Sequence, residues 1–240
     1  MLKWIKLKIM EKLSQRQEKI LELIVREYVE KPKPIGSEFL AQKLRLSSAT
    51  IRNEMKKMEK IGYLIKPHIS AGRIPSDKAY RFFIQSAKQK EVNLPIKITK
   101  KPIEDFSRDI AQILAEMSGS LAFSAIKELK SFYQAGLSNL LRFPEIKDRD
   151  YFSEMAEIVE KFEKNFDELF EKIKEDETRV FIGSENPLGR TRRLSIIISK
   201  CKTFNNKHAV IGLLGPTRMR YDYNLSLINK LKETLEDFNQ

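Results

Sequence analysis

Two short helices, each with its own cap and joined by a tight turn, constrain the fold of this chain more than any other feature. Ser37 and Ser47 both stand where a serine hydroxyl can cap the first turn of a helix. The first predicted helix runs to Leu44, and only Arg45 and Leu46 separate it from the second cap. So close a pair of helices is typical of a helix-turn-helix, whose second helix enters the major groove of DNA.

The second helix of this pair, predicted from Ser48 to Ile61, has two different faces. Ile51, Met55 and Met58 fall in one narrow apolar stripe at helical spacing. The predicted DNA contacts of this helix are Ser48, Ala49, Thr50, Arg52, Asn53, Lys56, Lys57 and Lys60. Arginine can read guanine and asparagine can read adenine in the major groove, while lysines suit phosphate. A lone helix with this pattern would be an ordinary solvated helix, but the short turn before it favours DNA recognition.

The residues after Gly62 predict a β-hairpin wing. Tyr63 to Lys66 is predicted as one strand, residues 67–72 as a loop, and Arg73 with Ile74 as the start of the return strand. Small loop residues allow close approach to DNA, and the two cationic side chains of the hairpin suit phosphate. The predicted DNA contacts of the wing are Lys66, His68, Ser70, Gly72 and Arg73.

Two further helices complete this module. Ser14 and Gln17 have the spacing of a capping box and open a helix that runs to about Val29. Ser76 caps a later helix, and the aromatic segment Tyr80 to Ile84 lies on it. These aromatic side chains are expected in the core or in a dimer contact.

The distribution of charge separates two modules. Residues 1–90 contain 21 Lys and Arg against 9 Asp and Glu, whereas residues 91–240 contain 24 of each, so the first module accounts for the whole net charge of +12. This asymmetry indicates a basic module for a polyanion joined to a neutral module with another task. We expect a basic N-terminal extension over 1–12, a winged-helix DNA-binding domain over 13–90, a linker over 91–102 and a further domain over 103–240.

The second module mixes helical and strand patterns, which predicts an α+β domain with a small antiparallel sheet. A helix is expected from Ile103 to Met117, and a single long helix from Phe152 to Ile173. Residues 118–125 are small and suit either a strand or a turn. The remaining expected elements are strands over Val180–Ile182, Leu194–Ser199 and Ala209–Leu214 and a helix over Tyr223–Phe238.

Nothing in the chain has the pattern of an enzyme. There is no metal-ligand spacing, no nucleophile elbow and no phosphate loop, so no catalytic residue, metal or cofactor is expected. His208 and Cys201 are interpreted as ordinary surface or core residues. A single cysteine fits a reduced, cytoplasmic setting, and the longest apolar stretches are too short to cross a bilayer. The basic extension could pack on its domain or touch a membrane surface.

Several strings in the chain resemble the HrcA heat-inducible repressor family. In the first module they are LSSATIRNEM, MEKIGYLIKPH and SAGRIPSDKAYRFF, and in the second AGLSNLLRFPE, IGSENPL and IGLLGPTRM. The resemblance implies a winged helix followed by a GAF-like domain. It also implies repression of chaperone operons by a homodimer on an inverted-repeat operator in double-stranded DNA, with the chaperonin GroEL as a partner.

The chain departs from the family between LAEMSG and YQAGLSNLL, where only Ser120 to Phe132 remain. Family members carry the first GAF-like strands and an inserted dimerisation segment there. We therefore expect a reduced GAF-like domain that lacks most of that segment. Dimer contacts would then use other apolar surface, either the helix around Tyr80 to Ile84 or the stripe Met155, Val159, Phe162 and Phe166. An alternative function stays open, in which the second domain of a winged-helix regulator senses a small effector.

Overall fold

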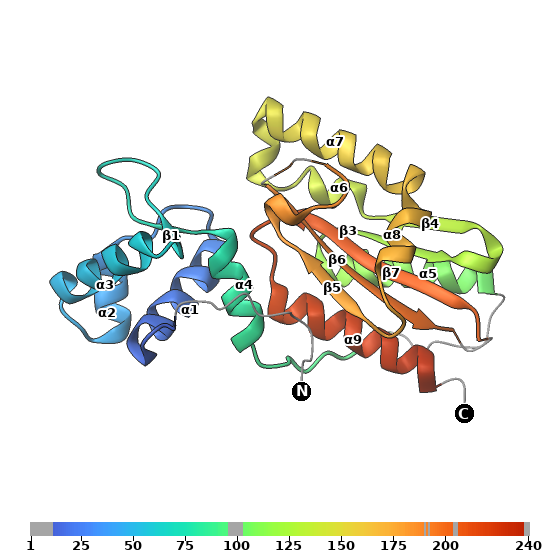
Figure 1. The fold of residues 1–240 in the computed structure, drawn as a ribbon, viewed down its shortest axis with the longest axis horizontal. Coiled ribbons are helices and arrows are strands. Elements are labelled where there is room, and N and C mark those ends of the chain that lie inside the picture. The colour runs from blue at the N-terminus through green and yellow to red at the C-terminus, as the bar shows by residue number, and fades with distance from the viewer. Residues whose placement is uncertain (1–11, 96–102, 190, 192, 204–205, 238–240) are drawn as a thin grey trace. The chain divides into compact units, whose positions relative to one another are not determined.

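The protein is described by a computed structural model that covers residues 12–95, 103–189, 191, 193–203 and 206–237. The chain divides into two compact units, residues 1–88 and residues 89–240, and each is described by itself (Figure 1). Residues 1–11 of the expected extension and residues 96–102 of the expected linker lie outside the described residues.

The first unit is the predicted winged helix-turn-helix (Figure 1). Its elements are α1 (Gln15–Glu30), α2 (Ser37–Leu44), α3 (Ser48–Lys60), β1 (Leu64–Ile65), β2 (Ile74–Pro75) and α4 (Asp77–Ser86). The capping box that opens α1 is confirmed, since Ser14 Oγ accepts from the Gln17 amide and the Gln17 side chain accepts from the Ser14 amide. The apolar faces of the helices meet in a core that includes Ile20, Leu21, Ile24, Leu40, Ile51, Met58 and Tyr63.

The turn between α2 and α3 differs from the prediction at one cap. Gly36, not Ser37, is the N-cap of α2, and the Ser37 hydroxyl instead forms a 3.0 Å hydrogen bond with the hydroxyl of Ser48. Ser47 caps α3 as predicted, accepting from the Thr50 amide at 3.1 Å. The serines of this segment therefore both start α3 and tie it to α2.

The second unit is an α+β domain around a five-stranded antiparallel sheet with the order β4-β3-β7-β6-β5. The strands are β3 (Leu121–Ile126), β4 (Ser131–Ala135), β5 (Thr178–Phe181), β6 (Leu194–Lys202) and β7 (His208–Pro216). The α-helices are α5 (Ile103–Ser118), α6 (Leu137–Leu140), α7 (Arg149–Lys164), α8 (Phe166–Lys172) and α9 (Tyr221–Asp237). Short 3-10 turns η1, η2 and η3 span Lys127–Leu129, Pro144–Lys147 and Gly183–Glu185.

Helices cover both faces of this sheet. On one face, α5 and α9 pack against the strands, and the Ser107 hydroxyl of α5 hydrogen-bonds the Ser124 hydroxyl of β3 at 2.8 Å. On the other face, α7 and α8 close a core that includes Phe123, Tyr151, Met155, Ile158, Phe162, Phe170, Ile196 and Ile198. Successive side chains of each strand point to opposite faces of the sheet, so the strands contribute to two separate apolar layers, one on each face.

The structure corrects one prediction for this unit and decides two points that the sequence left open. The single long helix predicted from Phe152 to Ile173 is two helices that break at Asn165, whose side-chain amide donates to the Lys161 carbonyl at 2.8 Å. Residues 121–126, left open between strand and turn, form a strand inside the sheet. The short stretch Ser120 to Phe132, where the resemblance places the family's first GAF-like strands, forms β3 and the start of β4, which pair as a hairpin that turns through residues 127–130.

The two apolar surfaces that were expected to form a dimer are largely buried within their own units. Tyr80, Phe83 and Ile84 are buried in the first unit, and Met155 and Phe162 are buried in the second. Among the described side chains of the second unit, the large apolar ones that are exposed are Leu137, Leu141 and Phe152. Among the described residues, no helix is long and apolar enough to span a membrane.

Candidate nucleic-acid interface

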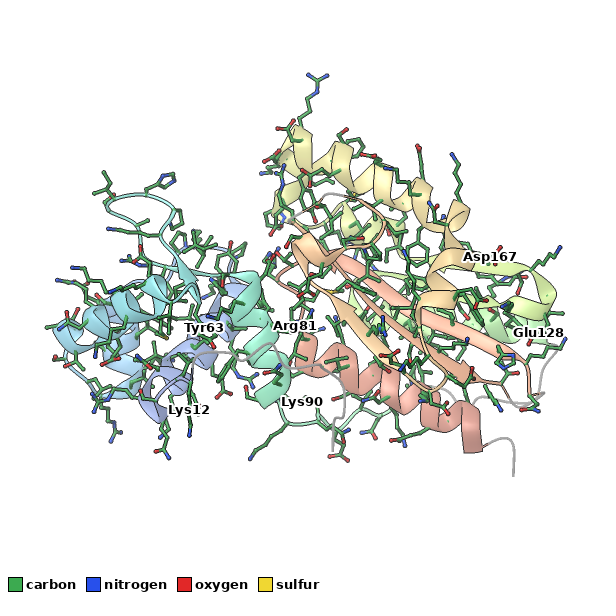
Figure 2. The ribbon with its side chains drawn as sticks, viewed as in Figure 1. Lys12, Tyr63, Arg81, Lys90, Glu128 and Asp167 are labelled. Carbon is green, nitrogen blue, oxygen red and sulfur yellow. The ribbon has the colours of Figure 1, made fainter. Side chains whose placement is uncertain are left out.

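The outward face of α3 carries the side chains that the sequence predicts for DNA. Ala49, Arg52, Asn53, Lys56, Lys57 and Lys60 are exposed, whereas Ser48 and Thr50 are half-buried near the start of the helix. The opposite stripe is buried, with Ile51 and Met58 fully enclosed. Figure 2 shows the side chains of this unit along the ribbon. The helix therefore presents a polar and basic row to solvent while its other side is fixed by the core.

The cationic groups of this row differ in how free they are. Lys57 forms an ion pair with Glu54 at 3.1 Å, although its side chain stays largely exposed. Within the part of the chain that the structure describes, Arg52, Lys56 and Lys60 have no ion-pair partner. Their charges remain available to neutralise phosphate or to donate to bases.

A buried carboxylate that the sequence did not single out fixes the position of α3. Glu54 is only 9% exposed, and its Oε2 accepts a 2.9 Å hydrogen bond from the side-chain amide of Gln17 in α1. The Gln17 side-chain oxygen thus accepts the hydrogen bond of the capping box, and its side-chain nitrogen donates to Glu54 of α3. Helical spacing places Glu54 beside the apolar stripe of α3, and this position in the sequence already indicates that its side chain is at least partly buried.

The wing hairpin holds most of its predicted contacts at the surface. Lys66, His68 and Ser70 are exposed, and Gly72 is half-buried. A Cβ added to Gly72 would come closer than 3.0 Å to the backbone of Ile35, because Arg73 and Ile35 form a β-bridge beside it. Glycine at this position is therefore needed for the close approach of two backbones, and this packing accounts for Gly72 without DNA.

The expectation that Arg73 contacts phosphate is not supported by its surroundings. Its side chain is buried and pairs with Glu59 of α3 at 2.7 and 2.8 Å, and it also donates to the carbonyls of Ala71 and Gly72. A guanidinium with these partners cannot reach a phosphate without leaving them. Arg73 is therefore a positioning residue that holds the wing against α3.

Substituting Arg73 by alanine is expected to lower the stability of the first unit by about 1–3 kcal/mol, because a largely buried charge-assisted pair is lost. The salt dependence of duplex binding is expected to keep its slope. Lys66→Ala is the matched control from the same hairpin, with unchanged stability and a slope reduced by about two units, one for each copy of a dimer on the duplex. Urea unfolding measures the stability of both variants, and a salt titration measures the slope of their duplex binding. Unchanged stability with a reduced slope for Arg73→Ala would show that Arg73 contacts phosphate after all.

One ion pair in the second unit connects two of the strings that carry the family resemblance, and a second group of ion pairs involves residues close to these strings in the sequence. Arg218 of GPTRM pairs through two nitrogens with Glu145 of LLRFPE, and its guanidinium lies 5.2 Å from the ring centroid of Phe143. Arg193 bridges Asp148 and Glu154 at 2.7 and 3.1 Å. The Asp148 carboxylate accepts hydrogen bonds from the Tyr151 amide and from the Arg193 side chain. These hydrogen bonds, that from Tyr151 most of all, hold the pKa of Asp148 below its usual range. These contacts hold the start of α7 against the sheet, which is a structural role.

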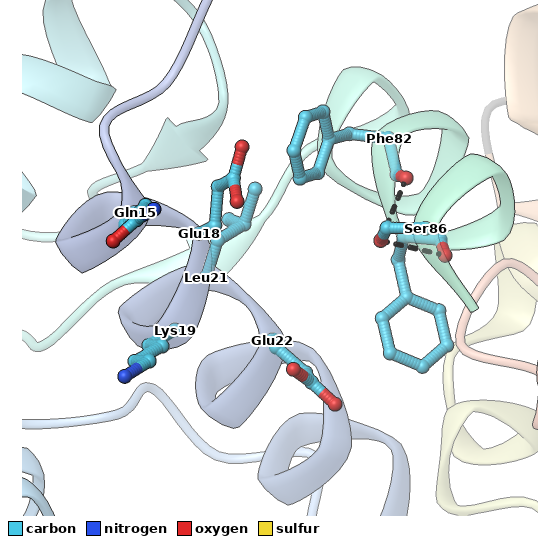
Figure 3. A pocket seen from close by; sticks show the side chains of 8 residues that line it. Gln15, Glu18, Lys19, Leu21, Glu22, Phe82 and Ser86 are labelled. Atoms are coloured by element: carbon cyan, nitrogen blue, oxygen red, sulfur yellow. Dashed lines mark hydrogen bonds between the residues drawn. The ribbon is translucent and has the colours of Figure 1, made fainter. Parts of the chain in front are cut away.

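A hollow between α1 and α4 lies apart from the predicted DNA contacts (Figure 3). Its walls are Gln15, Glu18, Lys19, Leu21, Glu22, Phe82, Phe83 and Ser86. The Ser86 hydroxyl is engaged with the carbonyls of Phe82 and Phe83 at 3.2 Å each. The hollow combines exposed charges with aromatic rings, and no residue predicted to contact DNA lines it.

Comparison with known proteins assigns the family. Residues 12–90 match the model for the winged helix-turn-helix transcription repressor HrcA DNA-binding domain, and residues 77–223 match the model for the HrcA protein C terminal domain. The chain belongs to the HrcA family. This family consists of transcription repressors and not enzymes, which agrees with the reading of the sequence.

Some individual relatives align with almost the whole length of this chain. The heat-inducible transcription repressor HrcA of Thermoanaerobacter pseudethanolicus is 28% identical over 336 residues, covering 94% of this chain and 96% of the relative. The repressor of the same name from Acetivibrio thermocellus is 43% identical over 114 residues, covering 46% of this chain and 32% of the relative. Since this chain has 240 residues, the 336-residue alignment leaves at least 96 positions (336 less 240) without a residue here.

A solved structure shares the fold. A crystal structure described as that of a hypothetical protein has a TM-score of 0.76 and 22% sequence identity, covering 95% of this chain and 98% of the other. The fold of this chain is therefore also found in an experimental structure.

Proposed function

We propose that this HrcA-family chain is a transcription repressor of chaperone operons that binds an inverted-repeat operator as a homodimer. The observation that carries the proposal is the exposed row of Arg52, Asn53 and three lysines on a helix whose other side is fixed in a core. Relatives that cover almost the whole chain are described as heat-inducible transcription repressors. Such a repressor acts where the chromosome is, so we place it in the cytoplasm.

The proposed DNA contacts follow from exposure and chemistry. They are Ser48, Ala49, Thr50, Arg52, Asn53, Lys56, Lys57 and Lys60 on α3, with Lys66, His68 and Ser70 on the wing. Gly72 and Arg73 support the wing instead. Arg52 and Asn53 would read base edges, and the lysines would contact phosphate.

The second unit is proposed to serve assembly and regulation. An inverted repeat is read by two copies related by a two-fold axis, and the exposed Leu137, Leu141 and Phe152 offer apolar surface to a second copy. We propose that this unit is the reduced GAF-like domain implied by the resemblance. GroEL is proposed as a partner on the same resemblance.

Salt dependence of duplex binding tests the proposal. Lys56, Lys57, Lys60 and Lys66 are exposed in each copy, so a dimer that used all of them would release counterions from about eight phosphates. The logarithm of the binding constant should then fall with the logarithm of salt concentration at a slope approaching about −7.

The measurement uses the full chain and a duplex selected from a random-sequence pool, with sedimentation of the free and bound protein. We expect an inverted repeat in the selected duplex and two copies of the chain bound to it. A flat salt dependence, or a monomer that binds single half-sites independently, would contradict the proposal.

A further inference from the structure

The tip of the wing carries an apolar side chain with almost no cover. Ile69 is 94% exposed, and its neighbours His68 and Ser70 are exposed too. The loop between β1 and β2 stands away from the helices of its unit (Figure 1). A single exposed apolar side chain is common on protein surfaces, so its meaning depends on how the chain presents it.

Ile69 stands at the corner of a closed turn. The Ala71 amide donates to the His68 carbonyl at 3.0 Å, which makes Ile69 and Ser70 the two central residues of the turn. Such positions favour Gly, Pro, Asn, Asp and Ser, whereas a β-branched side chain is stiff and prefers strands. The isoleucine therefore departs from both the local preference of the turn and the preference of apolar groups for burial. Departures of this kind are expected at functional sites.

The base of the same loop is held rigidly to the recognition helix. Arg73 and Ile35 exchange two backbone hydrogen bonds of 2.9 Å, and Gly72 packs directly on the Ile35 backbone. The ion pair between Arg73 and Glu59 then fixes the loop to α3 itself. The tip is thus carried at a set position beside the helix that is proposed to read the major groove.

We propose that Ile69 enters the minor groove of the operator duplex and contacts sugars and base edges there. This inference rests on the proposed function. The cationic Lys66 at the base of the loop favours approach to a polyanion, but an isoleucine offers nothing to a phosphate. Proteins that bind the minor groove use apolar side chains such as isoleucine and leucine against, or between, base steps.

The first test compares Ile69→Ala with the unchanged full chain on the selected operator duplex. Loss of three buried carbons should weaken binding by roughly fiftyfold for each copy bound, while the slope of the salt dependence stays the same because no phosphate contact is lost. Ile69→Leu should keep nearly full affinity. Ile65→Ala is the matched control, since it removes the same carbons from an isoleucine in strand β1 that is 48% exposed, and its affinity should change by less than about twofold.

The second test locates the contact on the duplex. Inosine replaces guanine one position at a time, which removes the amino group from the minor groove and leaves the major-groove pattern intact. The unchanged chain should respond at one position in each half-site, and Ile69→Ala should respond less at that same position. This coupling is the result that a general loss of affinity would not produce.

Two results would overturn the inference. Ile69→Ala could bind the operator within twofold of the unchanged chain with no coupled inosine position. It could also shift the sedimentation of the free protein while leaving the affinity of the dimer for DNA intact, which would make Ile69 a contact between copies. If the unchanged chain binds no duplex at all, the proposed function itself fails.

Discussion

Replacing Arg52 and Asn53 together by alanine is expected to remove most of the preference for operator over random duplex, by about a hundredfold or more. Each paired contact with a base is worth about 1–3 kcal/mol of discrimination. Both side chains are exposed on α3, and the buried stripe beneath them is untouched. Folding should therefore be unchanged, and binding to random duplex should fall only by the one lost positive charge in each copy.

The measurement is a gel-shift series on the selected operator and a scrambled duplex of the same composition. The matched control is the double variant Gln15→Ala and Arg16→Ala, because it removes an arginine and an adjacent amide from the exposed start of α1. That control should keep full operator preference. Equal discrimination in the two double variants would show that α3 is not the recognition helix.

Gly212→Ala is expected to destabilise the second unit by about 3 kcal/mol, at the upper end of overpacking in a core. A Cβ at this position would lie closer than 3.0 Å to the Phe123 ring and to the Ile197 carbonyl. The ring cannot move aside freely, since it packs against Phe162 with 4.0 Å between ring centroids. The added carbon must therefore push apart strands in the middle of the sheet.

Urea unfolding followed by circular dichroism measures this effect. Gly189→Ala is the control in the same unit, because a Cβ there would meet Ile158 at 3.7 Å, an ordinary contact. The control should unfold close to the midpoint of the unchanged chain. An unchanged midpoint for Gly212→Ala as well would mean that the sheet can open at this point without cost.

Local signals in the sequence predicted the elements of the winged helix well. The capping box at Ser14 and Gln17 and the cap at Ser47 are each completed within three residues, so their hydrogen bonds can be anticipated from spacing alone. The apolar stripes of α1 and α3 face the core as the helical period requires.

Other features of the structure depend on which groups meet in the folded chain, and the local pattern of the sequence does not show this. Arg73 and Lys66 are both cations of one hairpin, but only Arg73 has Glu59 within reach, fourteen residues away on another element. Strand β4 has half-buried side chains and gains its place by pairing with β3. The break between α7 and α8 occurs at Asn165, where the side-chain amide donates a hydrogen bond to the backbone. The apolar pattern of the sequence does not reveal this hydrogen bond.

The hairpin β3–β4 bears on how chains of this family can differ in length. The resemblance places the missing segment between LAEMSG and YQAGLSNLL, where the structure has this hairpin. Paired strands lie about 5 Å apart, so any segment spliced in at the turn leaves and re-enters the sheet at nearly one point. Sequence can then be gained or lost there without displacing the strands on either side. A turn of this kind can therefore take up a length difference as large as the one in the 336-residue alignment, at least 96 positions, while the sheet on either side keeps its pairing.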